Sequence, residues 1–166
     1  EAIRETRESL MAEHLGVERV RQGFITSDPP NDALSEAVLV DWDGERLPLD
    51  VLIEVHLRTH ASTSPHTMRG KYRSALYVMD AVQADACAAA LARLQPGFDA
   101  PLITRVLPFR AFQPSDARFQ NYYATDPERP FCRTYIEPKL AMLRRRYGAS
   151  LVSPAASSGD ETTRAR

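Results

Sequence analysis

The chain has 166 residues, of which 43% are hydrophobic, and this is enough apolar material for the core of one ordinary domain. Its net charge of −1 gives no support to a nucleic-acid or membrane-surface partner. No apolar run approaches the roughly 20 residues of a membrane-spanning helix. The two cysteines, Cys87 and Cys132, form no metal-binding spacing, so no disulfide framework is expected and a cytoplasmic protein is the default.

Periodicity and turn residues predict strands that alternate with helices. In chain order we expect a charged helix over 1–15, strands over 17–25 and 35–42, a helix over 48–59, a strand over 71–79, a helix over 80–94, a strand over 102–109, and helices over 115–125 and 137–147. Within the helix over 80–94, Asp80 is the expected N-cap.

This order predicts an α+β fold built as a two-layer sandwich. We expect a ferredoxin-like mixed sheet with helices packed on it and a C-terminal segment that wraps over it. Residues 1–148 form the expected domain. The stretch over 149–166 is rich in Ser, Thr and Ala and has no periodicity, so a disordered tail is expected there.

Glu36 is the carboxylate whose position is most suggestive of chemistry. In an extended strand its side chain shares a face with Val38, Val40 and Trp42. An apolar neighbourhood disfavours the ionised form of a carboxyl group, which suits a proton donor near neutral pH. The plainer interpretation is a strand-end glutamate with its carboxylate in water, and the pattern alone favours that one.

Tyr72 and Cys132 have cationic neighbours in the sequence. Tyr72 opens a strand between Lys71 and Arg73, where a phenol can donate a hydrogen bond to a polar ligand, although an aromatic residue there is more often packing. Cations next to Cys132 can lower a thiol pKa, whereas Cys87 has the spacing of a core residue on an alanine-rich helix.

Three histidines suggest a metal site at first sight. His56 and His60 are four residues apart, which is one helical face, and His66 follows. No glutamate interrupts them in the H-E-x-x-H manner and no cysteine lies nearby. We therefore expect no metal, with His56 buried and the other two at the surface.

Read together, several short segments resemble the A-type peptide methionine sulfoxide reductases, which act on the S epimer of the sulfoxide. The resemblance covers about two thirds of the chain. Each segment alone is a weak signal, but their occurrence in the family's order is specific. The segments are Ser35-Glu36-Ala37-Val38, the helix 53–60 that ends in histidine, Gly70-Lys71-Tyr72-Arg73-Ser74-Ala75, Asn121-Tyr122-Tyr123, Pro130-Phe131-Cys132-Arg133 and Pro138-Lys139-Leu140.

The resemblance implies a reaction in which a cysteine thiolate attacks the sulfoxide sulfur, an acid protonates the oxygen, and a second thiol closes a disulfide that thioredoxin reduces. It implies that Glu36 is the proton donor, that Tyr72 holds the sulfoxide oxygen and that Tyr122 lines the substrate site. Phe24 stands where the family commonly has a tyrosine, and Thr67 where it often has an aspartate. The resemblance therefore implies fewer polar groups around the sulfoxide than the family usually has. Cys132 is the possible redox thiol.

The departure from the family concerns the nucleophile. The family carries it in a Gly-Cys-aromatic-aromatic segment before the first helix, and this chain has no such segment. If Glu8 matches the glutamate that follows the nucleophile, residues 3–5 replace the cysteine and the protein cannot catalyse the reaction. If Glu1-Ala2 matches that part of the family instead, the cysteine lies upstream. The start on glutamate favours the second alignment.

The resulting hypothesis is a thiol-dependent reductase of peptidyl methionine (S)-S-oxide, seen without its nucleophile. The alternative is a non-catalytic relative that binds methionine or its sulfoxide. For the reductase we expect a cytoplasmic monomer with no bound cofactor, thioredoxin as external reductant, oxidised proteins or peptides as substrates, and a role in protein repair under oxidative stress. A nucleic-acid-binding domain built on residues 144–146 lacks a basic stripe elsewhere.

Overall fold

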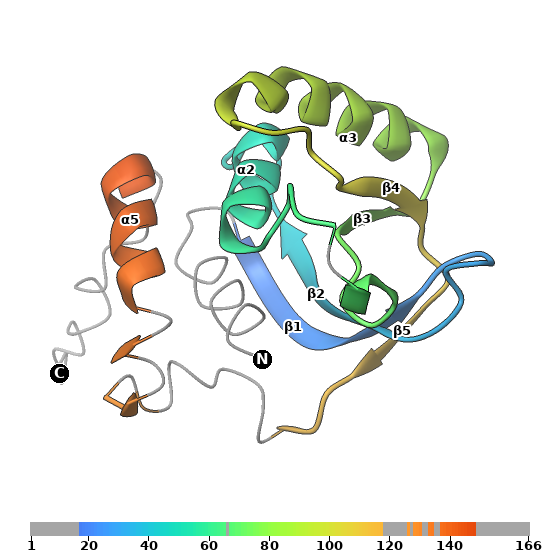
Figure 1. Ribbon diagram of the computed structural model, residues 1–166, viewed down its shortest axis with the longest axis horizontal. Helices are drawn as coiled ribbons and strands as arrows, with labels where there is room; N and C mark the ends of the chain where they lie inside the picture. The colour runs from blue at the N-terminus through green and yellow to red at the C-terminus, as the bar shows by residue number, and fades with distance from the viewer. Residues whose placement is uncertain are drawn as a thin grey trace, which may run out of the picture.

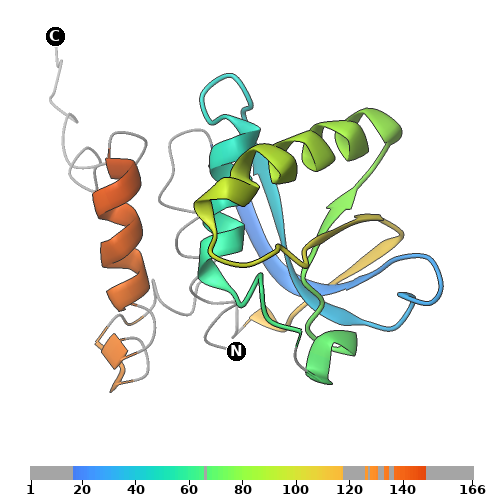
Figure 2. The same cartoon turned by 45° about the horizontal axis from the view of Figure 1, so that its top comes forward.

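The computed structural model of the protein describes residues 17–65, 67–117, 126, 128–130, 133–134 and 137–148. In chain order the elements are β1 (Val17–Thr26), β2 (Ser35–Trp42), α2 (Leu49–Thr59), the short 3-10 helix η1 (Thr67–Gly70), β3 (Ala75–Val78), α3 (Ala81–Leu94), the 3-10 turn η2 (Gln95–Gly97), β4 (Arg105–Pro108), β5 (Ala111–Pro114) and α5 (Glu137–Tyr147). Figures 1 and 2 show α2 and α3 on one side of the strands and α5 on the flank next to α2.

The described strands form two sheets. In the first, β1 lies between β2 and β5 and is antiparallel to both. In the second, β3 and β4 run parallel. Gly23 allows β5 to approach β1, because a Cβ atom at this position would lie 2.3 Å from the backbone oxygen of Gln113. Only glycine fits such a close backbone approach.

The main core lies where α2 and α3 pack against β3. Its buried members are Ile53, Leu57, Val78, Cys87 and Ala90. They follow the spacing expected for the inner faces of two amphipathic helices. The predicted cap of α3 is confirmed, since the Asp80 carboxylate accepts a hydrogen bond of 2.8 Å from the backbone N–H of Gln83.

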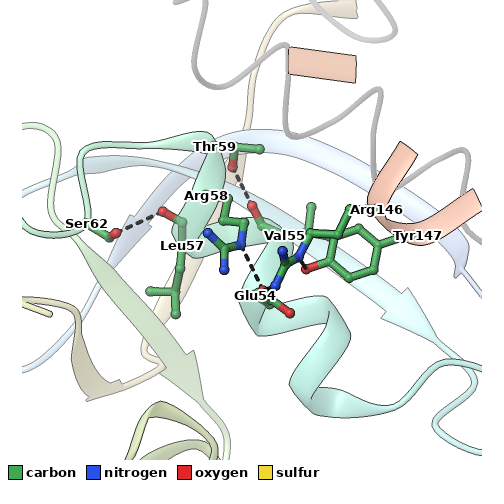
Figure 3. A network of polar contacts seen from close by, with 8 residues as sticks. All are labelled: Glu54, Val55, Leu57, Arg58, Thr59, Ser62, Arg146 and Tyr147. Atoms are coloured by element: carbon green, nitrogen blue, oxygen red, sulfur yellow. Dashed lines mark hydrogen bonds and ion pairs between the residues drawn. The ribbon is translucent and has the colours of Figure 1, made fainter. Parts of the chain in front are cut away.

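The last helix is attached to α2 by charged groups. Glu54 accepts hydrogen bonds of 2.8 Å from Arg58 one turn later and from Arg146 near the end of α5 (Figure 3). Burial disfavours the carboxylate, but hydrogen bonds from Tyr147 and Arg58 and the charges of the two arginines hold the pKa of Glu54 below its ordinary value. The Glu54–Arg146 ion pair therefore connects segments that are about 90 residues apart in the chain.

The α+β class is confirmed, and the arrangement of the strands differs from the expectation in two ways. Among the described residues the strands form two sheets where one mixed sheet was expected, because β2 and β3 are not paired with each other there. The strand expected over 71–79 begins only at Ala75, because residues 71–73 make hydrogen bonds to Ser35 and Glu36 that lie outside any strand ladder. The ferredoxin-like two-layer sandwich remains a prediction.

Several expected elements lie outside the described residues. These are the helix over 1–15, most of the helix over 115–125, and the tail over 149–166. The strand expected over 102–109 is shorter, at Arg105–Pro108, and β5 follows it without having been expected. Within the described ranges, none of the helices combines the length and the apolar character that a bilayer crossing demands.

Candidate active site

A cavity of about 300 Å³ lies between β2, β3 and the two helices that cover them. Most of its wall is apolar, as expected for a ligand pocket with few polar groups. The polar or ionisable side chains in the wall are those of Glu36, His56, Arg73, Tyr77, Gln83 and Cys87.

Glu36 stands where the start of β2 meets the segment that precedes β3. The buried hydroxyl of Ser35 donates to the carbonyl of Lys71 and accepts from the backbone N–H of Arg73, both at 3.0 Å. The N–H of Glu36 donates to the same carbonyl of Lys71 at 3.3 Å. This junction places Glu36 in the cavity wall beside the segment that carries Tyr72.

Tyr72 is half-buried at the same junction. Its backbone N–H donates to the carbonyl of Met68, and the Lys71 ammonium lies 5.3 Å from the centre of its ring. Residues 36 and 71–72 are therefore neighbours, as the sequence hypothesis required, but Tyr72 is not part of the cavity wall.

Arg73 is the cation that holds the junction in place. Its guanidinium donates to the Tyr77 hydroxyl at 2.9 Å, to the carbonyl of Ile25 at 3.2 Å and to the carbonyl of Ala33. One side chain thus joins β3, β1 and the connection before β2. Sequence reasoning treated Arg73 only as a neighbour of Tyr72, because its carbonyl partners come from segments 40 and 48 residues away.

A second polar chain lies behind the junction. The His60 ring bonds the Ser74 hydroxyl at 2.7 Å, and Ser74 bonds the Thr104 hydroxyl at 2.7 Å. The other ring nitrogen of His60 contacts the carbonyl of His56. With both of its ring nitrogens engaged, His60 is a structural link between α2 and β3, and His66 lies outside the described residues.

The other predicted site residues lie in different surroundings or outside the described residues. Phe24 is half-buried and stands directly opposite Glu36 in the β1–β2 register, so the two belong to one place on the sheet. Thr67 is exposed at the start of η1. Tyr122 and Cys132 lie outside the described residues, and their predicted roles stay predictions.

Cys87 reaches the cavity wall from α3. It is 7% exposed, and burial raises the pKa of its thiol, so the thiolate is disfavoured. Cys87 therefore has the environment of a core residue, as its spacing indicated.

Comparisons with known proteins agree on one family. The family model described as "Peptide methionine sulfoxide reductase" matches residues 6–151. A protein from Chromobacterium violaceum named peptide methionine sulfoxide reductase MsrA is 30% identical, over 84% of this chain and 89% of its own length. The protein of the same name from Thermus thermophilus is 32% identical, over 72% and 69%.

Solved structures add a likeness of fold. The reduced form of Mxr1 from Saccharomyces cerevisiae has a TM-score of 0.64 at 18% identity, over 79% of this chain and 84% of that one. An unusual oxidised form of the same protein gives 0.52, over 68% and 70%. With the family model matching most of its length, the chain belongs to the peptide methionine sulfoxide reductase family, A type.

Proposed function

We propose that this chain forms the acid-bearing scaffold of an enzyme that reduces peptidyl methionine (S)-S-oxide to methionine. The observation that carries the proposal is the position of Glu36. In a member of this family, Glu36 lines a mainly apolar cavity, beside Phe24 and next to the segment 71–73. A carboxyl group beside an apolar cavity is within reach of a bound sulfoxide oxygen, which is what a general acid requires.

The proposed chemistry is a transfer of oxygen from one sulfur to another. A thiolate attacks the sulfoxide sulfur, a proton reaches the oxygen from Glu36, and the oxygen leaves with the cysteine as a sulfenic acid while methionine is released. A second thiol condenses with the sulfenic acid to give a disulfide and water, and thioredoxin reduces the disulfide. By the resemblance, the phenol of Tyr72 would hold the oxygen from beside the cavity, since Tyr72 neighbours the wall without being part of it.

We also propose that the attacking thiol is not among the residues of this chain. Cys87 has a raised pKa and sits in the core, which does not suit a nucleophile. The remaining cysteine, Cys132, is assigned by the resemblance to a late segment. The substrates would be oxidised proteins or peptides, and the protein would act in the cytoplasm as a monomer with no bound cofactor.

The test compares this chain with the product of the complete reading frame, in which we expect a cysteine before residue 1. With dithiothreitol and acetyl-methionine sulfoxide amide, the complete protein should reduce the S epimer and not the R epimer, while this chain should be inactive. In the complete protein, Glu36→Gln should lower kcat about a hundredfold or more, because general acids contribute that much. Glu45→Gln, at an exposed position, is the control. A complete protein without S-epimer activity would contradict the proposal.

A binding module remains the second candidate, and the burial of Cys87 is the observation that favours it. In that case the complete protein would bind methyl sulfoxide peptides without turnover. Calorimetry would show binding that weakens in both Glu36→Gln and Tyr72→Phe. Turnover of the S epimer would exclude this function.

A further inference from the structure

One methionine lies at the outer end of the junction that holds Glu36. Met68 belongs to η1, and its carbonyl accepts the backbone N–H of Lys71 at 3.2 Å and that of Tyr72 at 3.0 Å. The carbonyl of Lys71 in turn accepts the N–H of Glu36 at 3.3 Å. A short path of backbone hydrogen bonds therefore leads from Met68 to the carboxyl-bearing residue of the candidate site.

The side chain of Met68 is open to solvent. It is 54% exposed, and among the described methionines only Met79, at 59%, is comparable, since Met142 is half-buried. Peroxides oxidise an accessible thioether to a sulfoxide, which turns an apolar side chain into a polar one. The O–O bond of hydrogen peroxide breaks, one oxygen bonds to the sulfur, which is oxidised by two electrons, and the other oxygen leaves as water.

The surroundings of Met68 suit the oxygen that this step adds. Lys71 and Tyr72 follow it by three and four residues within one hydrogen-bonded turn, and this spacing brings side chains to the same face. The Lys71 ammonium lies 5.3 Å from the centre of the Tyr72 ring. A thioether sulfur is a weak acceptor, whereas a sulfoxide oxygen is a strong one, and an ammonium group carries three N–H donors. Oxidation therefore creates an acceptor beside a cation.

Met79 has similar exposure and the opposite surroundings. The next residue is Asp80, whose carboxylate accepts the N–H of Gln83 at 2.8 Å. The N–H of Met79 itself donates to the Gln83 side chain, also at 2.8 Å. A carboxylate is an acceptor and repels a sulfoxide oxygen, so these contacts do not hold the oxidised side chain. Met79 is thus a matched control within the same chain.

We propose that Met68 is an oxidation site and that its sulfoxide oxygen accepts a hydrogen bond from the Lys71 ammonium. The new bond competes with the Tyr72 ring for the same cation, and the attraction of a cation to an aromatic face is weak at an exposed site. A peroxide thereby changes the segment that meets Glu36. Only the repair of this sulfoxide by a second copy of the protein would rest on the proposed function.

The chain contains its own reporter for this contact. Lys71 and Lys139 are its two lysines, so reductive methylation with ¹³C-formaldehyde gives few NMR signals. The dimethylated side chain keeps its positive charge and one N–H donor. Lys71→Arg assigns the Lys71 signal, because it removes that signal alone. Peptide mass spectrometry then measures how much of each methionine is oxidised after treatment with hydrogen peroxide.

In a partly oxidised sample, the Lys71 signal should lose intensity to new, shifted signals in proportion to the oxidised fraction of Met68. The same change is expected in Met79→Leu and is not expected in Met68→Leu. Leucine keeps an apolar side chain and a similar helix propensity, so both variants should fold. The Tyr72 amide should also exchange about twofold more slowly after oxidation, which is the size of effect that a surface contact within one turn has.

Three results would overturn the proposal. A Lys71 signal that stays unchanged while Met68 is oxidised would show that the new oxygen remains in water. New signals that persist in Met68→Leu would assign the change to another residue. Slower oxidation of Met68 than of half-buried Met142 would remove the modification site itself. None of these readouts measures reduction of a substrate, so this proposal and the proposed function can fail separately.

Discussion

The helical half of the molecule and the β1–β2 half are held together in different ways. Around α2, α3 and β3, apolar side chains such as Leu57 and Val55 are at most 1% exposed. Along β2, by contrast, Val38, Val40 and Trp42 are only half-buried and line the cavity. The first half therefore buries its apolar side chains more completely than the second does. The comparison teaches that apolar packing holds the helical half together. The candidate site lies instead at the polar junction between the two halves.

The largest expected effect is in the closed half. Leu57→Ala removes a side chain that is 1% exposed, and we expect a loss of about 2–5 kcal/mol of unfolding free energy, because the cavity cannot fully collapse. Urea unfolding at pH 7 measures it. Leu34→Ala, at a position that is 50% exposed, is the matched control and should change little. Equal losses in the two variants would mean that the helical half is not the better packed one.

The next effect concerns the other half. Gly23→Ala forces a Cβ atom against the Gln113 backbone, so we expect about 1–3 kcal/mol of destabilisation and faster exchange of the β5 amides. Gly44→Ala is the control, since its Cβ would meet only the Trp42 indole at 3.8 Å. If both substitutions were neutral, the close approach of β5 to β1 would be wrong.

A smaller effect depends on pH and tests the attachment of α5. The pKa of Glu54 lies below its ordinary value of 4.5, so its ion pairs stabilise the fold above that pH and the stabilisation is lost as pH falls through the lowered pKa. Glu54→Gln should cost about 0.5–1 kcal/mol at pH 7, since Arg146 is half exposed, and nothing in strong acid. A cost that does not change with pH would contradict this explanation. Glu45→Gln serves as the exposed control.

The smallest effect is expected at the surface of the β1–β2 half. Asp28 and Arg110 form an exposed ion pair at 2.6 Å, and the pKa of Asp28 is lowered by the hydrogen bond from Arg110. Water and salt screen such a pair, so Asp28→Asn should leave the urea midpoint unchanged within error. A clear loss of stability would show that this loop holds the sheet more firmly than its exposure suggests.

Sequence reasoning located most elements because their signals are local. The strand at Ser35–Trp42 and the helix at Glu137–Tyr147 have the predicted bounds, and Asp80 caps α3 as predicted. It could not tell which residues of β2 are the most buried. The alternating residues Val38, Val40 and Trp42 are half-exposed, whereas Ser35 and Ala37 are buried, because what covers a strand is a matter of distant segments.

For the site, sequence reasoning identified Glu36 and placed it near residues 71–72. It missed the side chains whose hydrogen bonds hold these segments together. Ser35, Arg73 and the His60–Ser74–Thr104 chain act through partners 14 to 48 residues away. Hydroxyl groups and arginines of this kind carry no periodic signal. No pattern in a single sequence points to their partners.

The amino-acid sequence by itself determined the succession of strands and helices, the class of the fold and the family, because each depends on short segments and their order. Only the tertiary structure decided that the described strands divide into two sheets, that Glu36 lies in a cavity wall and that Tyr72 does not. The physical reason is that pairing of strand edges and burial of side chains depend on which distant residues meet, and that is settled only when the chain is folded.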